Sequence, residues 1–204
     1  MNLTRDYLSV PKVCSRRLRG MTLWNIVLSG YPGSGKTRLA QRLVEDNENF
    51  VRLSVDDLRD MYFGPGRPPK EEEFVYGTIS TLRDTALESR RSVVIDTTAP
   101  RNNTREFLLR TRVNNVVQLL VLLMVSKPVL DARNLERQVG GAVEAWDKVW
   151  ENPSTNMPVM KFRNNSPTEF ETGYYLLTDL LRSKVHPYKR RFFTHIYPRI
   201  WSNR

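Results

Sequence analysis

The sequence predicts an α/β protein, a three-layer sandwich in which a mostly parallel β-sheet is covered by helices on both faces. Aliphatic runs of strand length, at 23–29, 50–54, 92–96 and 116–125, alternate with segments whose apolar residues recur at helical spacing. A glycine-rich turn also follows the first run and leads directly into a helical segment. In folds of this kind, ligands bind at the carboxyl ends of the strands.

Length and composition predict one domain with extensions. The 204 residues, 40% of them apolar, are enough for a single core. We assign residues 1–21 to a basic extension, 22–183 to the domain and 184–204 to a basic aromatic tail. No apolar run reaches the roughly 20 residues of a membrane span, and the polar first 20 residues are unlike a secretory signal. With Cys14 as the only cysteine, we expect a cytoplasmic protein without a membrane partner or an internal disulfide.

The net charge of +10 favours a polyanionic partner, although a solvated basic surface is the simpler reading of any one run. The two ends of the chain are both basic. They carry Arg5, Lys12, Arg16, Arg17 and Arg19 near the start, and Arg182, Lys184, Lys189, Arg190, Arg191, Arg199 and Arg204 near the end. We therefore expect a nucleic acid partner, with DNA favoured.

The first strand, at 23–29, is followed by a phosphate-binding loop. The loop fits G-x-x-x-x-G-K-[ST] and consists of Gly30, Tyr31, Pro32, Gly33, Ser34, Gly35, Lys36 and Thr37. Glycines let backbone N–H groups converge on a phosphate at the start of a helix, here expected to run to about residue 45. Lys36 can reach the β- and γ-phosphates, and the Thr37 hydroxyl can hold Mg²⁺. The loop predicts binding of ATP, or another nucleoside triphosphate, with Mg²⁺.

The second strand, at 50–54, leads into a helix at 55–62 that we expect to begin at an aspartate. Asp56 would lie beside the γ-phosphate as a general base, and Arg59 can aim at a phosphate of the acceptor or of the nucleotide. Helix capping and a surface arginine are the alternatives. Residues 64–69 are too rich in glycine and proline for regular structure. A helix at 71–90 should bury Phe74, Val75, Ile79, Leu82 and Ala86.

The third strand, at 92–96, ends in a carboxylate. Asp96 in this place is typical of a residue that orders Mg²⁺ through water, with capping of the next turn as the alternative. Thr97 should face the same crevice. A turn at 98–103, a helix at 104–112 and a strand at 116–125 follow.

A helix at 130–139 carries two arginines on one face, because Arg133 and Arg137 are spaced i, i+4. We expect residues 127–141 to form a lid over the triphosphate, hinged at Gly140-Gly141, with an exposed basic helix as the alternative. Beyond it we expect a short helix at 142–150, a loop at 151–166 with a possible strand at 159–162, and a helix at 169–183. The buried side of that last helix should consist of Tyr174, Leu177, Leu180 and Leu181.

Over residues 23–140 the chain resembles the bacteriophage-type polynucleotide 5′-hydroxyl kinases. The resemblance rests on the phosphate loop, the 55–59 segment, the 95–97 strand end and the two arginines of the lid. It implies a P-loop kinase fold in which Asp56 is the general base and Arg59 contacts the acceptor 3′-phosphate. It also implies that Asp96 and Thr97 lie near the acceptor nucleotide, and that Arg137 is the lid arginine with Arg133 in support. The chain is similar, too, to phage kinases that phosphorylate 5-hydroxymethyluracil within DNA.

These observations predict an ATP- and Mg²⁺-dependent kinase acting on a hydroxyl of a nucleic acid, either a 5′-hydroxyl or the hydroxymethyl group of a modified uracil. The Asn-Lys-x-Asp motif of GTPases and the D-x-D-G-T signature of an attached phosphatase are absent. Two alternatives stay open. One is a small-molecule kinase for a nucleoside, sugar or antibiotic, and the other is a nucleic-acid-stimulated ATPase. The sequence does not predict an oligomeric state.

Overall fold

The computed structural model describes residues 22–65, 72–138 and 142–183. Its sheet has five strands, all parallel, in the order β2-β3-β1-β4-β5. These strands are β1 (Leu23–Ser29), β2 (Phe50–Ser54), β3 (Ser92–Asp96), β4 (Val116–Met124) and β5 (Val159–Arg163). The two basic extensions and the Gly140-Gly141 pair predicted as a hinge lie outside the described residues.

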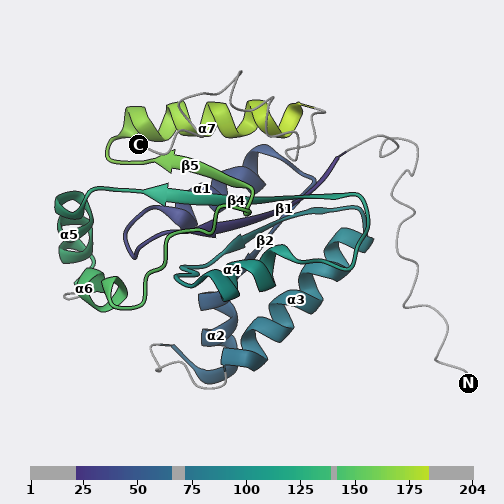
Figure 1. Cartoon of the computed structure of the whole chain (residues 1–204), viewed down its shortest axis with the longest axis horizontal. Helices are drawn as coiled ribbons and strands as arrows, with labels where there is room; N and C mark the ends of the chain where they lie inside the picture. The colour runs from purple at the N-terminus through teal and green to yellow at the C-terminus, as the bar shows by residue number, and fades with distance from the viewer. Residues whose placement is uncertain (1–21, 66–71, 139–141, 184–204) are drawn as a thin grey trace, which may run out of the picture.

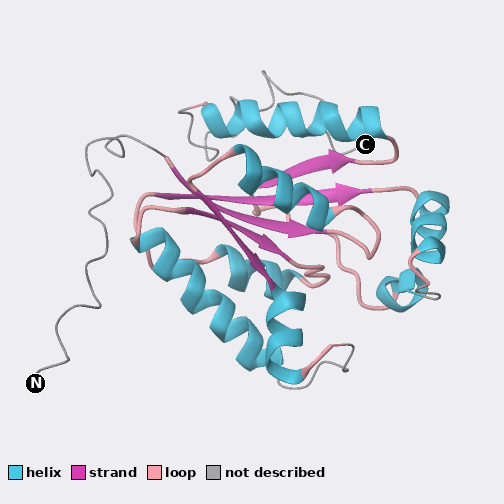
Figure 2. Cartoon of the chain, turned by 180° about the vertical axis from the view of Figure 1, so that it is seen from behind, coloured by secondary structure: helices cyan, strands magenta, loops and turns pink. Residues whose placement is uncertain are grey.

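Helices cover both faces of the sheet (Figures 1 and 2). One face packs against α1 (Lys36–Asp46) and α7 (Pro167–Arg182), and the other against α2 (Val55–Phe63), α3 (Glu72–Glu88) and α4 (Asn102–Leu109). Alternate residues of β1 serve the two cores, since Trp24, Ile26 and Leu28 face the first and Leu23 and Val27 face the second. The predicted three-layer α/β architecture is confirmed, and so is the possible strand near 159–162.

Two short helices lie beyond the carboxyl end of the sheet. They are α5 (Lys127–Glu136) and α6 (Ala142–Asp147), and Figure 1 shows them past the arrowhead of β4. Strand β1 lies between β3 and β4 in the sheet, and the phosphate loop leaves β1 at this same end. Helix α5, part of the predicted lid, and the phosphate loop therefore share the edge of the sheet at which ligands bind in such folds.

The buried side of α3 differs from the predicted one. Val75 and Ile79 are buried as expected, but Phe74 and Leu82 are 52% and 41% exposed. The buried row instead continues at four-residue spacing to Arg83, with Asp84 beside it. An apolar pattern alone cannot reveal this, because the two buried charges satisfy each other and neighbouring backbone groups.

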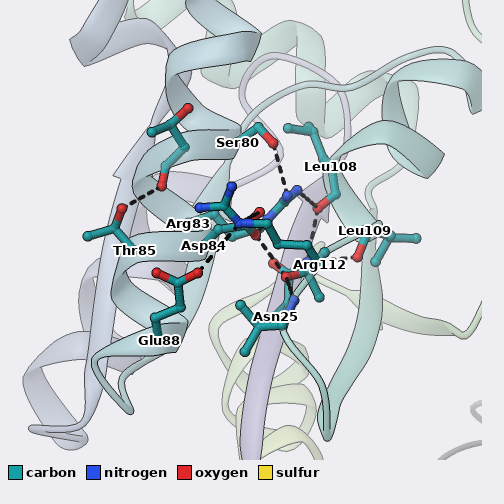
Figure 3. Close-up of polar contacts among 12 residues, drawn as sticks. Asn25, Ser80, Arg83, Asp84, Thr85, Glu88, Leu108, Leu109 and Arg112 are labelled. Atoms are coloured by element: carbon teal, nitrogen blue, oxygen red, sulfur yellow. Dashed lines mark hydrogen bonds and ion pairs between the residues drawn. The ribbon is translucent and has the colours of Figure 1, made fainter.

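Figure 3 shows how Arg83 and Asp84 fit into the core. Arg83 Nε donates to Asp84 Oδ1 at 2.8 Å, and its Nη1 donates to the Leu108 carbonyl at 3.0 Å. The side chain of Asn25, from the middle of β1, donates to the carbonyls of Leu108 and Leu109 at 3.0 Å each. These side chains therefore cap the carboxyl-terminal end of α4.

Local capping explains the small shifts in helix ends. Helix α2 begins at Val55 rather than at an aspartate, because the Ser54 side chain accepts a hydrogen bond from the Asp57 N–H at 3.1 Å. Helix α7 begins at Pro167, and Ser166 caps it in the same way. Among the described residues, no helix is both long and apolar enough to cross a membrane.

Candidate active site at the phosphate loop

The phosphate loop runs from the end of β1 to the first turn of α1. Gly33 and Gly35 take φ values of 81° and 91°, in the left-handed region that residues with a Cβ rarely adopt. Within the described residues, the backbone N–H groups of Gly33, Gly35 and Lys36 have no hydrogen-bond acceptor. They stand at the amino-terminal end of α1, where free N–H groups and the helix dipole favour an anion.

Lys36 folds back over the loop. Its Nζ donates to the carbonyls of Gly30 and Tyr31 at 2.8 and 2.9 Å. Burial lowers the pKa of Lys36 to about 8, while the charges of Asp96 and Asp56 act to raise it and that of Arg137 acts to lower it. The lysine is therefore within electrostatic reach of three residues predicted for the site, which come from β3, α2 and the end of α5.

The predicted general base lies at the start of α2 and is ion-paired. The exposed carboxylate of Asp56 accepts a hydrogen bond from Arg59 Nη1 at 2.5 Å. Arg59 also holds Glu72, the first residue of α3, at 2.9 to 3.0 Å. Its guanidinium is thus set between two carboxylates, and its contact with an acceptor phosphate stays a prediction.

Tyr76, on α3, is a neighbour of this group that the sequence analysis did not single out. Burial raises the pKa of Tyr76, and a hydrogen bond with Thr97 acts in the opposite direction. The charges of Glu72, Arg59 and Asp56 also act on its hydroxyl. Thr97 directly follows β3 and is buried, and its partner in this hydrogen bond is Tyr76.

Asp96 is buried at the tip of β3 and pairs with an arginine of β2. Both Nε and Nη2 of Arg52 donate to Asp96 Oδ2, at 3.2 and 2.8 Å. The third nitrogen, Nη1, holds Asp57 at 2.7 Å, so Asp57 belongs to this pair rather than to the loop. Thr37 lies exposed in the first turn of α1.

The two arginines of the predicted lid are placed differently. Arg133 donates to the carbonyls of Gly33 and Asn164, at 3.3 and 2.9 Å, and so contacts the backbone of the loop itself. Arg137 is exposed at the carboxyl end of α5, and its charge acts on Lys36. Direct contact of either arginine with a nucleotide stays a prediction.

A set of contacts that no sequence motif indicates ties Tyr31 of the loop to a segment far along the chain. Tyr31 donates through its hydroxyl to Asp147 at 2.8 Å, and its ring stacks on Trp150 at 4.5 Å. The guanidinium of Arg105 lies over the same indole, 4.8 Å from the ring centroid. Isolated aromatic and acidic residues carry no periodic signal, so only the fold reveals this contact.

Arg105 is fully buried and holds the backbone at Ala99 and Glu151. Its Nε donates to the Ala99 carbonyl at 2.8 Å, and its Nη1 to the Glu151 carbonyl at 2.6 Å. Ala99 has a φ of 37°, unusual for a residue with a side chain. Burial lowers the pKa of Arg105 to about 10, which leaves the guanidinium charged at neutral pH.

Comparisons with known proteins agree with the fold. A family model described as an AAA domain, AAA_33, matches residues 26–155. No curated protein matches the sequence. A sugar kinase from Janibacter sp. HTCC2649 is similar in structure, with a TM-score of 0.61 and 16% identity over 77% of this chain and 95% of that one.

Two structures of the Pnkp1/Rnl/Hen1 complex are similar as well. One has 25% identity and a TM-score of 0.50, over 55% of this chain and 39% of that one. The other, described as an RNA repair complex, has 19% identity and a TM-score of 0.52, over 78% and 45%. Together these likenesses show a P-loop kinase-like α/β fold.

Proposed function

Since the chain belongs to the AAA domain family AAA_33, we propose that it is a P-loop kinase that transfers the γ-phosphoryl group of ATP to a hydroxyl of a nucleic acid. One arrangement supports the proposal: Asp56, held at the start of α2 by Arg59, and Arg137, directly after α5, both lie within electrostatic reach of the lysine of the phosphate loop. Transfer to an alcohol needs a proton acceptor and a cation at the same phosphorus. Asp56 and Arg137 supply them.

On the donor side, the residues bind and neutralise the triphosphate. The free N–H groups of Gly33, Gly35 and Lys36 receive the phosphate oxygens. Lys36 exchanges its two carbonyl partners for the β- and γ-phosphates. Arg137 then offsets the charge that develops on the transferring group.

On the acceptor side, Asp56 takes the proton of the attacking hydroxyl while the bond between the γ-phosphorus and the ADP oxygen breaks. Asp56 and Glu72 orient the charged guanidinium of Arg59, so it can bind an acceptor phosphate without first being positioned. A phosphate beside the reacting hydroxyl is what a nucleic acid offers and a free sugar lacks. The Arg59 position therefore supports a nucleic acid acceptor.

The residues also fit a magnesium ion bound together with the nucleotide. Thr37 presents an exposed hydroxyl beside the loop, and among the described contacts Arg52 uses only Oδ2 of Asp96. Mg²⁺ typically keeps several waters and takes one or two protein oxygens alongside the phosphates. Thr37 would hold the ion directly and Asp96 through water, and the ion would neutralise phosphate charge.

A second candidate is a small-molecule kinase. The observation in its favour is that the Janibacter sugar kinase is matched over 95% of its length, so nearly the whole of that protein shares this fold. Arg59 would then orient a carboxylate or a phosphate of a metabolite.

The test is to follow the label from [γ-³²P]ATP in parallel reactions. The acceptors are a DNA oligonucleotide with a 5′-hydroxyl, a 5′-phosphorylated strand containing 5-hydroxymethyluracil, and a panel of sugars and nucleosides. We expect label on one of the two DNAs and none on an unmodified 5′-phosphorylated strand. Label on small molecules alone, or release of inorganic phosphate alone, would overturn the nucleic acid proposal.

A further inference from the structure

The outer side of the phosphate loop is held by side chains from distant parts of the chain. Each carbonyl from Gly30 to Ser34 accepts a side-chain hydrogen bond. Lys36 serves the first two. The other three donors are Asn134 to Pro32 O at 3.0 Å, Arg133 to Gly33 O at 3.3 Å and Asn164 to Ser34 O at 2.8 Å.

These three donors come from two separate elements. Arg133 and Asn134 are on α5, whereas Asn164 follows β5 directly. Arg133 joins the two, because its Nη2 also donates to the Asn164 carbonyl at 2.9 Å. The three side chains form a clamp across the loop, and we call Arg133, Asn134 and Asn164 the carbonyl clamp.

The two amides of the carbonyl clamp are buried and oriented by the loop. Asn134 and Asn164 are only 4% and 3% exposed. Within the described structure their Oδ1 atoms have no hydrogen-bond partner, so the bonds from Nδ2 to the loop are the ones that fix each amide. A Cβ on Gly33 would come within 3.0 Å of Asn134 Oδ1, and one on Gly35 would overlap the Asn164 amide. The loop and the amides are in direct contact.

A loop that binds phosphate has to present N–H groups inward and carbonyls outward. A 180° rotation of a peptide unit would turn its N–H outward and its carbonyl oxygen inward, so that the partial negative charge of the oxygen would face the phosphate. A donor on each outward carbonyl opposes that rotation. The carbonyl clamp therefore favours the anion-receiving conformation before any nucleotide arrives.

We infer that Arg133, Asn134 and Asn164 are positioning residues, which act on the nucleotide through the loop backbone and hold α5 against it. This rests on the proposed function only in that the loop binds a nucleotide. Arg133 thus differs from Arg137, since its guanidinium is engaged with the Gly33 and Asn164 carbonyls. Two hydrogen bonds, from Arg133 and from Asn134, hold α5 to the loop.

The test replaces the donating amide by a carboxyl group of the same shape. With Asn164→Asp, an ionised carboxylate would face the Ser34 carbonyl and repel it. We expect the affinity for the non-hydrolysable analogue AMPPNP, measured by calorimetry at pH 8, to fall by about tenfold or more. Relative to the wild type, the affinity should recover as the pH is lowered toward 5, because burial at position 164 raises the pKa of the introduced carboxyl group and the protonated group can donate again.

Three further variants separate this role from simple packing. Asn164→Ala removes the donor without adding a charge, so its affinity relative to the wild type should be lower but independent of pH. Asn114→Asp, at an exposed asparagine before β4, should bind AMPPNP as the wild type does. Asn134→Asp repeats the test from α5 if the 164 variant does not fold, as judged by far-UV circular dichroism.

The outcomes are distinguishable. Wild-type affinity in both the 164 and 134 aspartate variants at pH 8, or a loss that does not recover at low pH, would overturn the clamp while leaving nucleotide binding intact. Failure of the wild type itself to bind AMPPNP would overturn the clamp and the proposed function together.

Discussion

At the scale of single residues, we propose that Lys36 exchanges one set of partners, the backbone carbonyls of the loop, for another, the phosphates of the nucleotide. Without a nucleotide its Nζ bonds to the carbonyls of Gly30 and Tyr31. Burial holds its pKa near 8, even though Asp96 and Asp56 act to raise it. Because a lysine binds phosphate only in its protonated form, the nucleotide affinity has to depend on pH in a range where most lysines do not titrate.

The expected pH dependence has a definite sign. Lys36 carries its proton below pH 8 and loses it above, and a bound triphosphate favours the protonated form. The AMPPNP affinity should therefore fall about tenfold between pH 7 and pH 9, with uptake of a proton on binding in the upper part of that range. Calorimetry in buffers with different ionisation enthalpies measures both quantities.

Lys36→Arg is the matched control for this prediction. A guanidinium keeps its proton throughout the range, so the variant should bind more weakly than the wild type but with no fall between pH 7 and pH 9. The prediction fails if the wild-type affinity is constant over that interval, or if the arginine variant shows the same fall.

At the scale of elements, the buried ion pair of Arg83 and Asp84 on α3 lies against the end of α4. Burial alone would raise the pKa of Asp84, but hydrogen bonds from Arg83 and Thr111 and the charges of Arg83 and Arg112 lower it overall. Arg83 in turn holds the end of α4 through the Leu108 carbonyl. Loss of the carboxylate charge would leave Arg83 buried without a counter-ion.

We expect Asp84→Asn to lower the free energy of unfolding at pH 7 by about 3 kcal/mol, since an uncompensated buried charge costs several kcal/mol. A carboxylate whose pKa is lowered on folding stabilises at pH values above its ordinary pKa of 3.8 and loses that effect as the pH falls through the folded value. The difference between variant and wild type should therefore shrink toward pH 3.

Urea denaturation at both pH values measures this difference. Glu73→Gln, at an exposed position of the same helix, is the control and should change stability by less than about 0.5 kcal/mol. If Asp84→Asn has the same free energy of unfolding as the wild type at pH 7, the ion pair does not stabilise the contact between α3 and α4.

At the scale of the whole molecule, the sequence predicts the sheet well because its signals are local. Four aliphatic runs became β1 to β4, and the loop between β1 and α1 follows from the spacing of its glycines and lysine. The prediction of the buried side of α3 fails, because contacts between residues far apart in the sequence determine which side chains are buried there. The spacing of Phe74 and Leu82 predicts a buried stripe, but Arg83 and Asp84 are buried instead, and Arg83 donates to the Leu108 carbonyl at the end of α4.

The candidate site divides in the same way. Motif residues such as Lys36, Asp56 and Asp96 stand at strand ends or helix starts, and a parallel sheet brings such places together. Asn164, Tyr76 and Arg105 reach the site only through the fold. Each is a single polar or aromatic residue without a periodic neighbour, and Asn164 lies 130 residues from the Ser34 carbonyl that it holds.

The most direct test of the central claim is a single-turnover measurement of phosphoryl transfer by Asp56→Asn, with the acceptor that the wild type labels. If Asp56 is the general base beside the phosphate held by Lys36 and Arg137, the asparagine amide that replaces it cannot accept the proton of the attacking hydroxyl. Transfer should then slow by a factor of about 10² or more, with AMPPNP affinity within twofold of the wild type. Asp60→Asn, exposed on the same helix, should transfer at the wild-type rate. Unchanged transfer by Asp56→Asn would contradict the account.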